Sequence, residues 1–181
     1  MANIYKKRGK SEQTNKEGGY KNVVLFAPVD TFLTMGVPTN APAVAGDKVS
    51  ISDDHTFGAE DGFISLLSKK HSVTTTSEST GDDGAKSLVH KAKFVLLGDD
   101  ASTLEQMRDM LNDDIVWLVK DQDCANTDTF IQLGDGCLQP TATISFDGKT
   151  TAEGLKEYTV ELSVKDKKFF YSGTVTQKPV E

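Results

Sequence analysis

The stretch HSVTTTSESTGDDGAKSLVHKAKFVLL, residues 71–97, predicts two strands joined by a turn at Gly81–Gly84. Its second arm, Leu88–Leu97, alternates in the way that a strand with one buried face does. The first arm, Thr74–Thr80, contains only threonine, serine and one glutamate, and offers almost nothing to a core. We therefore expect a long hairpin over about residues 70–97 with an apolar base and a polar far half.

Several other segments carry strand patterns, and many of them are bounded by turn residues. They are residues 21–27, 48–53, 115–119, 129–133, 138–146, 155–164 and 169–176. The segment Ile115–Val119 is apolar throughout, which predicts a central strand. Residues 57–70 fit either a short helix or a strand, and the pattern favours a strand from about Gly62.

One helix is predicted over about residues 101–112. Ser102 and Glu105 have the spacing of a capping box. The apolar stripe of this helix consists of Leu104, Met107, Met110 and Leu111. Many strands and one flanking helix predict a mainly β fold, an antiparallel β-barrel or sandwich with a long hairpin arm.

The composition predicts one domain over residues 20–181 of the 181-residue chain, preceded by a flexible N-terminal arm over residues 1–19. The arm holds five Lys or Arg residues and little apolar material, which is typical of a segment that orders on a partner. A formal net charge of −7 argues against binding a nucleic acid through its phosphates. No apolar run approaches the roughly 20 residues of a membrane span, so we expect no membrane partner and no secretory leader.

The residues that could carry chemistry do not form a recognisable site. The segment Asp53–His55 could bind a metal only if a third ligand converged on it, and a solvated turn is the favoured interpretation. His71 and His90 are interpreted as a cross-strand pair in the hairpin. Cys124 and Cys137 are expected to be reduced thiols. We therefore expect no enzymatic activity, no cofactor and no metal.

Polar arms and exposed strand edges gain partners when copies of a chain associate, because an isolated hairpin is only marginally stable in water. The hairpin is therefore predicted to contact a neighbouring copy of the chain. The residues expected in this contact are Val73, Thr74, Thr75, Thr76, Ser77, Glu78, Ser79, Thr80, Leu88 and Val89.

The order of the elements resembles that of the tail tube protein of long-tailed bacteriophages and, more distantly, the tube protein of type VI secretion. The shared features are a basic arm, a long loop after the first strand, a hairpin, and one helix before a β-rich half. In that half the similar stretches are Ile131–Gly134, Thr141–Ile144, Tyr158–Leu162 and Tyr171–Val175. The resemblance implies a β-barrel that forms hexameric rings, with the hairpin and the arm reaching neighbouring copies.

The same resemblance implies a lumen lined with negative charge, through which DNA slides without specific binding. The arm residues expected to contact neighbours are Tyr5, Lys6, Lys7 and Arg8. The candidate lumen residues are Asp113, Asp114, Glu157 and Glu161. Besides other copies of itself, the expected partners are virion tail or connector proteins.

The resulting hypothesis is a virion structural protein, assembled in the cytoplasm of a bacterial host, that forms a tail tube or a related tail or connector ring. A head–tail connector, a tail terminator or a capsid decoration protein fits the same pattern. A glycan-binding β-sandwich module is a further alternative. Trp117 lies in an apolar run typical of a core, so no aromatic binding platform is evident.

Overall fold

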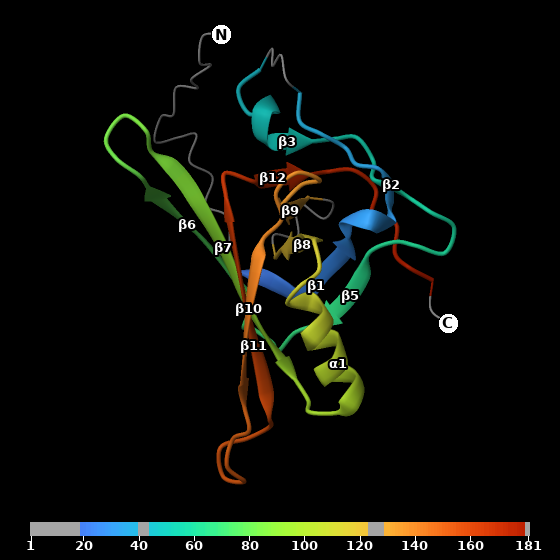
Figure 1. Ribbon diagram of the computed structural model, residues 1–181, viewed down its shortest axis with the longest axis vertical. Coiled ribbons are helices and arrows are strands. Elements are labelled where there is room, and N and C mark those ends of the chain that lie inside the picture. The colour runs from blue at the N-terminus through green and yellow to red at the C-terminus, as the bar shows by residue number, and fades with distance from the viewer. Residues whose placement is uncertain (1–18, 40–43, 123–128, 180–181) are drawn as a thin grey trace.

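The computed structural model describes residues 19–39, 44–122 and 129–179 (Figure 1). This part of the chain is mainly β, with two larger sheets, a small two-stranded sheet and one α-helix. The predicted N-terminal arm lies outside the described residues, apart from Gly19.

The larger sheet has six strands in the spatial order β3-β12-β9-β8-β1-β5. These strands are β1 (Tyr20–Pro28), β3 (Ser50–Ile51), β5 (Ile64–Leu67), β8 (Ile115–Asp121), β9 (Phe130–Leu133) and β12 (Lys168–Tyr171). The apolar run predicted to be central is β8, which pairs with β1 on one side and with β9 on the other. Residues 115–119 are all buried, because both faces of the sheet are covered at this strand.

The second sheet has four strands in the order β10-β11-β7-β6, and every neighbouring pair is antiparallel. They are β6 (Thr74–Thr80), β7 (Ser87–Leu97), β10 (Thr141–Asp147) and β11 (Glu157–Lys165). The predicted hairpin is confirmed as the β6–β7 pair. Since β7 also pairs with β11 from Val89 to Leu97, the hairpin is half of a sheet and not an isolated ribbon.

Two cores lie on the two faces of the six-stranded sheet. The first fills the space between this sheet, the four-stranded sheet and the helix, where the Trp117 ring lies 5.4 Å from Phe26 and 5.6 Å from Phe94. The second core, around Leu118 and Tyr171, is covered by the small sheet of β2 (Phe32–Thr34) and β4 (Thr56–Phe57).

The two main sheets are open, with a different strand at each end, so they do not close into a barrel. Of the two predicted architectures, the sandwich describes the fold. The short 3₁₀ turns Val29–Thr31 and Asp47–Val49 connect its strands.

The single helix is α1 (Ala101–Met110), two residues shorter than predicted. Its N-cap is Asp100, whose carboxylate accepts a hydrogen bond from the backbone N–H of Thr103 at 2.8 Å. The predicted capping box from Ser102 was wrong, because Asp100 already occupies that role. Met107 and Met110 are buried in the first core, as the stripe predicted. The other two members of the stripe, Leu104 and Leu111, stay exposed.

Candidate assembly surface

Strand β6 is an edge of the four-stranded sheet. One side of it pairs with β7, in a register that runs from Thr74 opposite Lys93 to Thr80 opposite Ser87. Its other side has no strand partner among the residues that the structure describes. A free edge of this kind presents a row of backbone N–H and C=O groups that can pair with another chain.

The side chains of β6 explain how a strand without apolar residues stays on the sheet. Thr75 and Ser77 face the interior, where their hydroxyls have partners. The Thr75 hydroxyl lies 2.5 Å from the phenol oxygen of Tyr20, and the Ser77 hydroxyl lies 2.8 Å from Nδ1 of His90. Hydrogen bonds therefore replace apolar contacts on the inner side of this strand.

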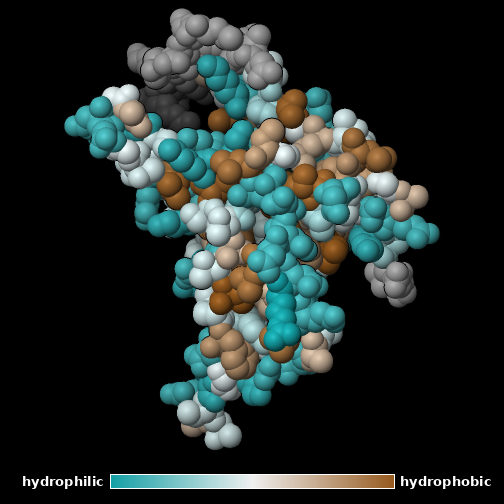
Figure 2. Space-filling model, viewed as in Figure 1, coloured by the Kyte–Doolittle hydropathy of each residue, from teal (hydrophilic) through white to brown (hydrophobic). Residues whose placement is uncertain are grey.

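Val73 and Leu88, at the margins of the predicted contact, differ in exposure. Val73 is 4% exposed and belongs to the first core, so it stabilises the fold and has no surface to offer a second copy. Leu88 is exposed, but its backbone N–H donates to the Asp166 carboxylate at 2.7 Å. The hairpin is thus anchored at β11 and exposed mainly along β6 and at its tip. Figure 2 shows mostly hydrophilic residues at the tip.

The outer face of the four-stranded sheet is mostly polar, with Val89, Val95 and Leu97 of β7 as its apolar members. It forms a shallow groove whose lining includes Thr74, Thr76, Lys91, Lys93, Thr143 and Glu161. Lys93 forms an ion pair with Glu161 at 2.8 Å, and Lys91 forms one with Glu78 at 2.9 Å. The groove is therefore lined by hydroxyls and by paired charges of both signs.

The four candidate lumen carboxylates do not come together in one place. Glu157 and Glu161 lie on this outer face, because they alternate with the buried residues of β11. Glu157 is already neutralised by Lys69 at 2.8 Å and Lys149 at 3.1 Å, and these hydrogen bonds lower the pKa of its carboxyl. Glu157 and Glu161 thus lie on a face of paired charges, whereas the resemblance implies a lumen lined with negative charge.

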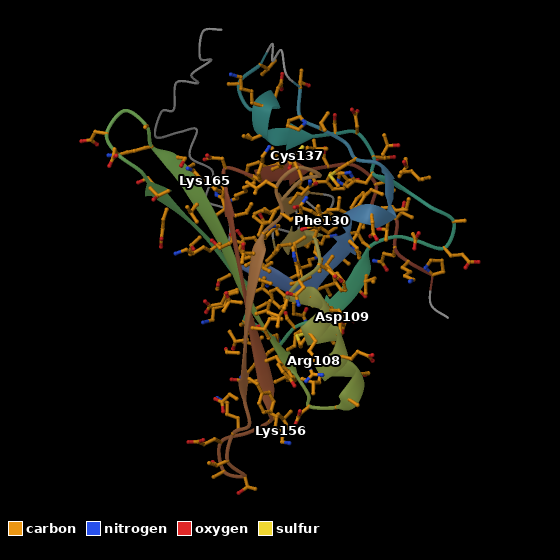
Figure 3. The ribbon with its side chains drawn as sticks, viewed as in Figure 1. Arg108, Asp109, Phe130, Cys137, Lys156 and Lys165 are labelled. Atoms are coloured by element: carbon orange, nitrogen blue, oxygen red, sulfur yellow. The ribbon has the colours of Figure 1, made fainter. Side chains whose placement is uncertain are left out.

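Asp113 and Asp114 lie beyond the C-terminal end of α1, and both are exposed. The opposite end of this helix is tied to the start of β11 by the ion pair between Asp99 and Lys156 at 2.6 Å. Figure 3 labels Lys156 near that end of the helix. A ten-residue helix is about 15 Å long, which separates these two aspartates from Glu157.

The remaining candidates form no chemical site in the described part of the chain. No group of three His, Cys, Asp or Glu side chains there could hold a metal ion. The predicted pairing of His71 with His90 was wrong, because the residue opposite His90 is Ser77 and His71 lies in the preceding turn. Cys137 is an exposed thiol, and Cys124 lies outside the described residues, as does the arm from Tyr5 to Arg8.

Sequence reasoning missed His55, which it assigned to a solvated turn. The side chain is 2% exposed and bonded through both ring nitrogens. Its neighbour Asp54 is also held in place, because the Asp54 carboxylate accepts a hydrogen bond from the backbone N–H of Thr174. No local sequence pattern indicated either contact.

Comparison with known proteins gives no match, whether to a protein-family model, to a curated protein or to a solved structure. None of the described helical segments has the length and apolar character needed to cross a membrane.

Proposed function

We propose that the protein is a virion structural protein that assembles head to tail into rings, as a tail tube or a related tail or connector ring. The observation that carries the proposal is that, within the described part of the chain, one sheet ends in two strands without an outer partner, β6 and β10, each seven residues long. Two unpaired edges on one sheet are what a protein needs to bind copies of itself on both sides by strand addition.

The directions of the strands support a head-to-tail contact. Four strands that alternate in direction leave β6 and β10 running in opposite senses. When neighbouring copies are related by rotation about a ring axis, β10 of one copy is therefore antiparallel to β6 of the next. Each added copy extends a single antiparallel sheet, and the sheet closes when the rotation closes. The resemblance to tail tube proteins implies six copies.

In such a ring the outer face of the four-stranded sheet lines the channel, since its other face is filled by the first core. The channel wall then carries hydroxyl groups, lysines already paired with glutamates, and the apolar side chains of Val89, Val95 and Leu97. Lysines held by neighbouring carboxylates attract the DNA backbone less than free lysines do. This wall suits the passage of DNA without specific binding.

The alternatives differ in how well the surface supports them. A tail terminator or a connector ring would use the same two edges, and a capsid decoration protein has no evident use for both. A glycan-binding module would need exposed aromatic side chains. Trp117 is 1% exposed within the first core, so it offers no such platform.

The test is the size and shape of the purified full-length chain, measured by sedimentation velocity and electron microscopy. We expect closed rings with a central channel. Stable monomers at all concentrations would overturn the proposal.

Two matched variants test the role of β6, Glu78→Pro and Ser79→Pro. Consecutive residues of a strand direct their N–H groups to opposite sides, so one proline removes a donor from the free edge and the other removes one from the pairing with β7. The variant whose lost N–H group faces the free edge should keep the wild-type melting temperature and lose the rings. If both variants form wild-type rings, β6 is not the contact.

A further inference from the structure

His55 lies directly before β4, on the face of the six-stranded sheet that the small sheet covers. Its imidazole ring stacks on the ring of Tyr171, with centroids 4.3 Å apart and planes 2° apart. Phe32 meets the imidazole edge-on at 5.5 Å. The side chain is 2% exposed, so its hydrogen bonds must be satisfied within the protein.

Both ring nitrogens of His55 have defined partners. Nδ1 accepts a hydrogen bond from the backbone N–H of Gly36 at 3.0 Å. Nε2 lies 2.9 Å from the Oε1 atom of Gln132, whose Nε2 group donates to the carbonyl of Gly134 at 3.0 Å. Because Oε1 can only accept, the imidazole must carry its proton on Nε2. The network thus fits one neutral tautomer of His55.

Protonation would break this network at a single point. A proton on Nδ1 would face the N–H of Gly36, so two donors would oppose each other in a buried position. Gly36 is closely packed against the backbone of Asp53, since a Cβ atom built there would lie 2.5 Å from the carbonyl oxygen of Asp53.

The titratable groups around the ring do not stabilise the protonated form enough to reverse this preference. Burial lowers the pKa of His55, while the hydrogen bond with Gln132 and the charge of Asp54 raise it less strongly. The hydroxyl of Tyr171 is occupied, because it accepts from the backbone N–H of His55 and donates to the carbonyl of Thr174.

The hydrogen bond from Gly36 to Nδ1 of His55 joins the chain that follows β2 to the second core. Within the described residues 35–39, no other hydrogen bond joins this segment to the rest of the protein. Val37 in this segment is 64% exposed. Loss of the acceptor at one imidazole nitrogen would therefore remove the hydrogen bond of a segment with an exposed apolar residue.

We propose that His55 is an acid-sensitive latch: when neutral it holds residues 35–39 against the sheet through Gly36, and when protonated it releases them. The latch is independent of ring assembly. Burial holds the pKa of His55 in the folded chain below the ordinary value of 6.5, so the latch is closed above pH 6.5. It opens as the pH falls through the pKa that His55 has in the folded chain.

The direct test is amide hydrogen exchange of the full-length chain by NMR, with each rate divided by its intrinsic rate at the same pH. The protection of the Gly36 amide should fall about tenfold for each pH unit below the midpoint of the His55 ring titration. The amide of Leu118, in the centre of β8, should keep its protection. Protection of Gly36 that is independent of pH would overturn the proposal, and so would a parallel loss at Leu118.

A pair of variants checks that His55 is the group responsible. His55→Gln should make the exchange of Gly36 independent of pH between 7 and 5. The matched control, His71→Asn, removes an exposed histidine at a left-handed position that asparagine tolerates, and it should keep the wild-type response. A pH dependence of Gly36 exchange that survives in H55Q would contradict the assignment, and so would one that disappears in H71N. If H55Q does not fold, agreement between the His55 and Gly36 midpoints in the wild type decides the question.

Discussion

The six-stranded and the four-stranded sheets differ in how much of each the chain itself covers. The larger sheet has a core on both faces, and its edge strands β3 and β5 are only two and four residues long. The four-stranded sheet has one core-facing side and two edges of seven residues. Short edges protect a sheet from further pairing, whereas long ones permit it. This contrast is the basis of our proposal that stability resides in the larger sheet and assembly in the smaller one.

The largest effect is expected where the larger sheet meets the first core. Replacing Trp117 by alanine removes a buried ring that contacts Phe26 and Phe94, and leaves a cavity. The free energy of unfolding should fall by about 3–5 kcal/mol in urea titrations. A loss below about 1 kcal/mol would show that β8 is not the centre of the fold.

A smaller effect is expected from acid, and it involves both cores. Burial lowers the pKa of His55 in the second core and, together with the charge of Lys168, that of His90 in the first. Because the unfolded chain binds protons more readily at these sites, the free energy of unfolding should fall as the pH drops below about 6.5. Urea titrations between pH 7.5 and 5 measure this. The slope of the free energy of unfolding against pH should decrease in both His55→Gln and His90→Asn. If this slope is unchanged in both variants, the two histidines do not cause the pH dependence.

The third prediction separates the two sides of β6. Thr75→Val keeps the shape of the side chain but removes the hydroxyl that contacts Tyr20, and should cost about 1 kcal/mol. The matched change Thr76→Val on the outer face should alter the free energy of unfolding by no more than about 0.5 kcal/mol. Equal costs would mean that the inward hydroxyls do not hold the strand.

The smallest effect is expected at the charged pairs of the outer face. Lys93 and Glu161 are both about half exposed, so their interaction should contribute roughly 0.2–1 kcal/mol. A double-mutant cycle with Lys93→Ala and Glu161→Ala isolates this energy. A coupling above about 2 kcal/mol would indicate a structural role that the geometry does not suggest.

The sequence predicted the features that depend on local pattern. The alternation in β7 and β11 identified strands with one buried face, and the apolar run of β8 identified a central strand. The turn at Gly81–Gly84 identified the hairpin, because glycines there can adopt the left-handed backbone that both of them show.

The features that depend on distant pairing could not be predicted. Nothing near Leu97 indicates that it pairs with Glu157, and this pairing makes the hairpin part of a sheet. The role of His55 was hidden for the same reason, since its partners Gly36 and Gln132 lie 19 and 77 residues away. Val73 was assigned to the polar arm because its neighbours are threonines, yet it lies over the core.

The most direct test of the central claim is cross-linking between the two free edges. In a chain with Cys124→Ser and Cys137→Ser, cysteines replace Thr76 on β6 and Thr143 on β10, and a short bis-maleimide joins them. We predict a ladder of oligomers that ends at one closed species in the double variant, and no cross-linked product in either single variant. Dimers from Thr76→Cys alone would show that β6 pairs with itself, and the absence of any product in the double variant would contradict head-to-tail assembly.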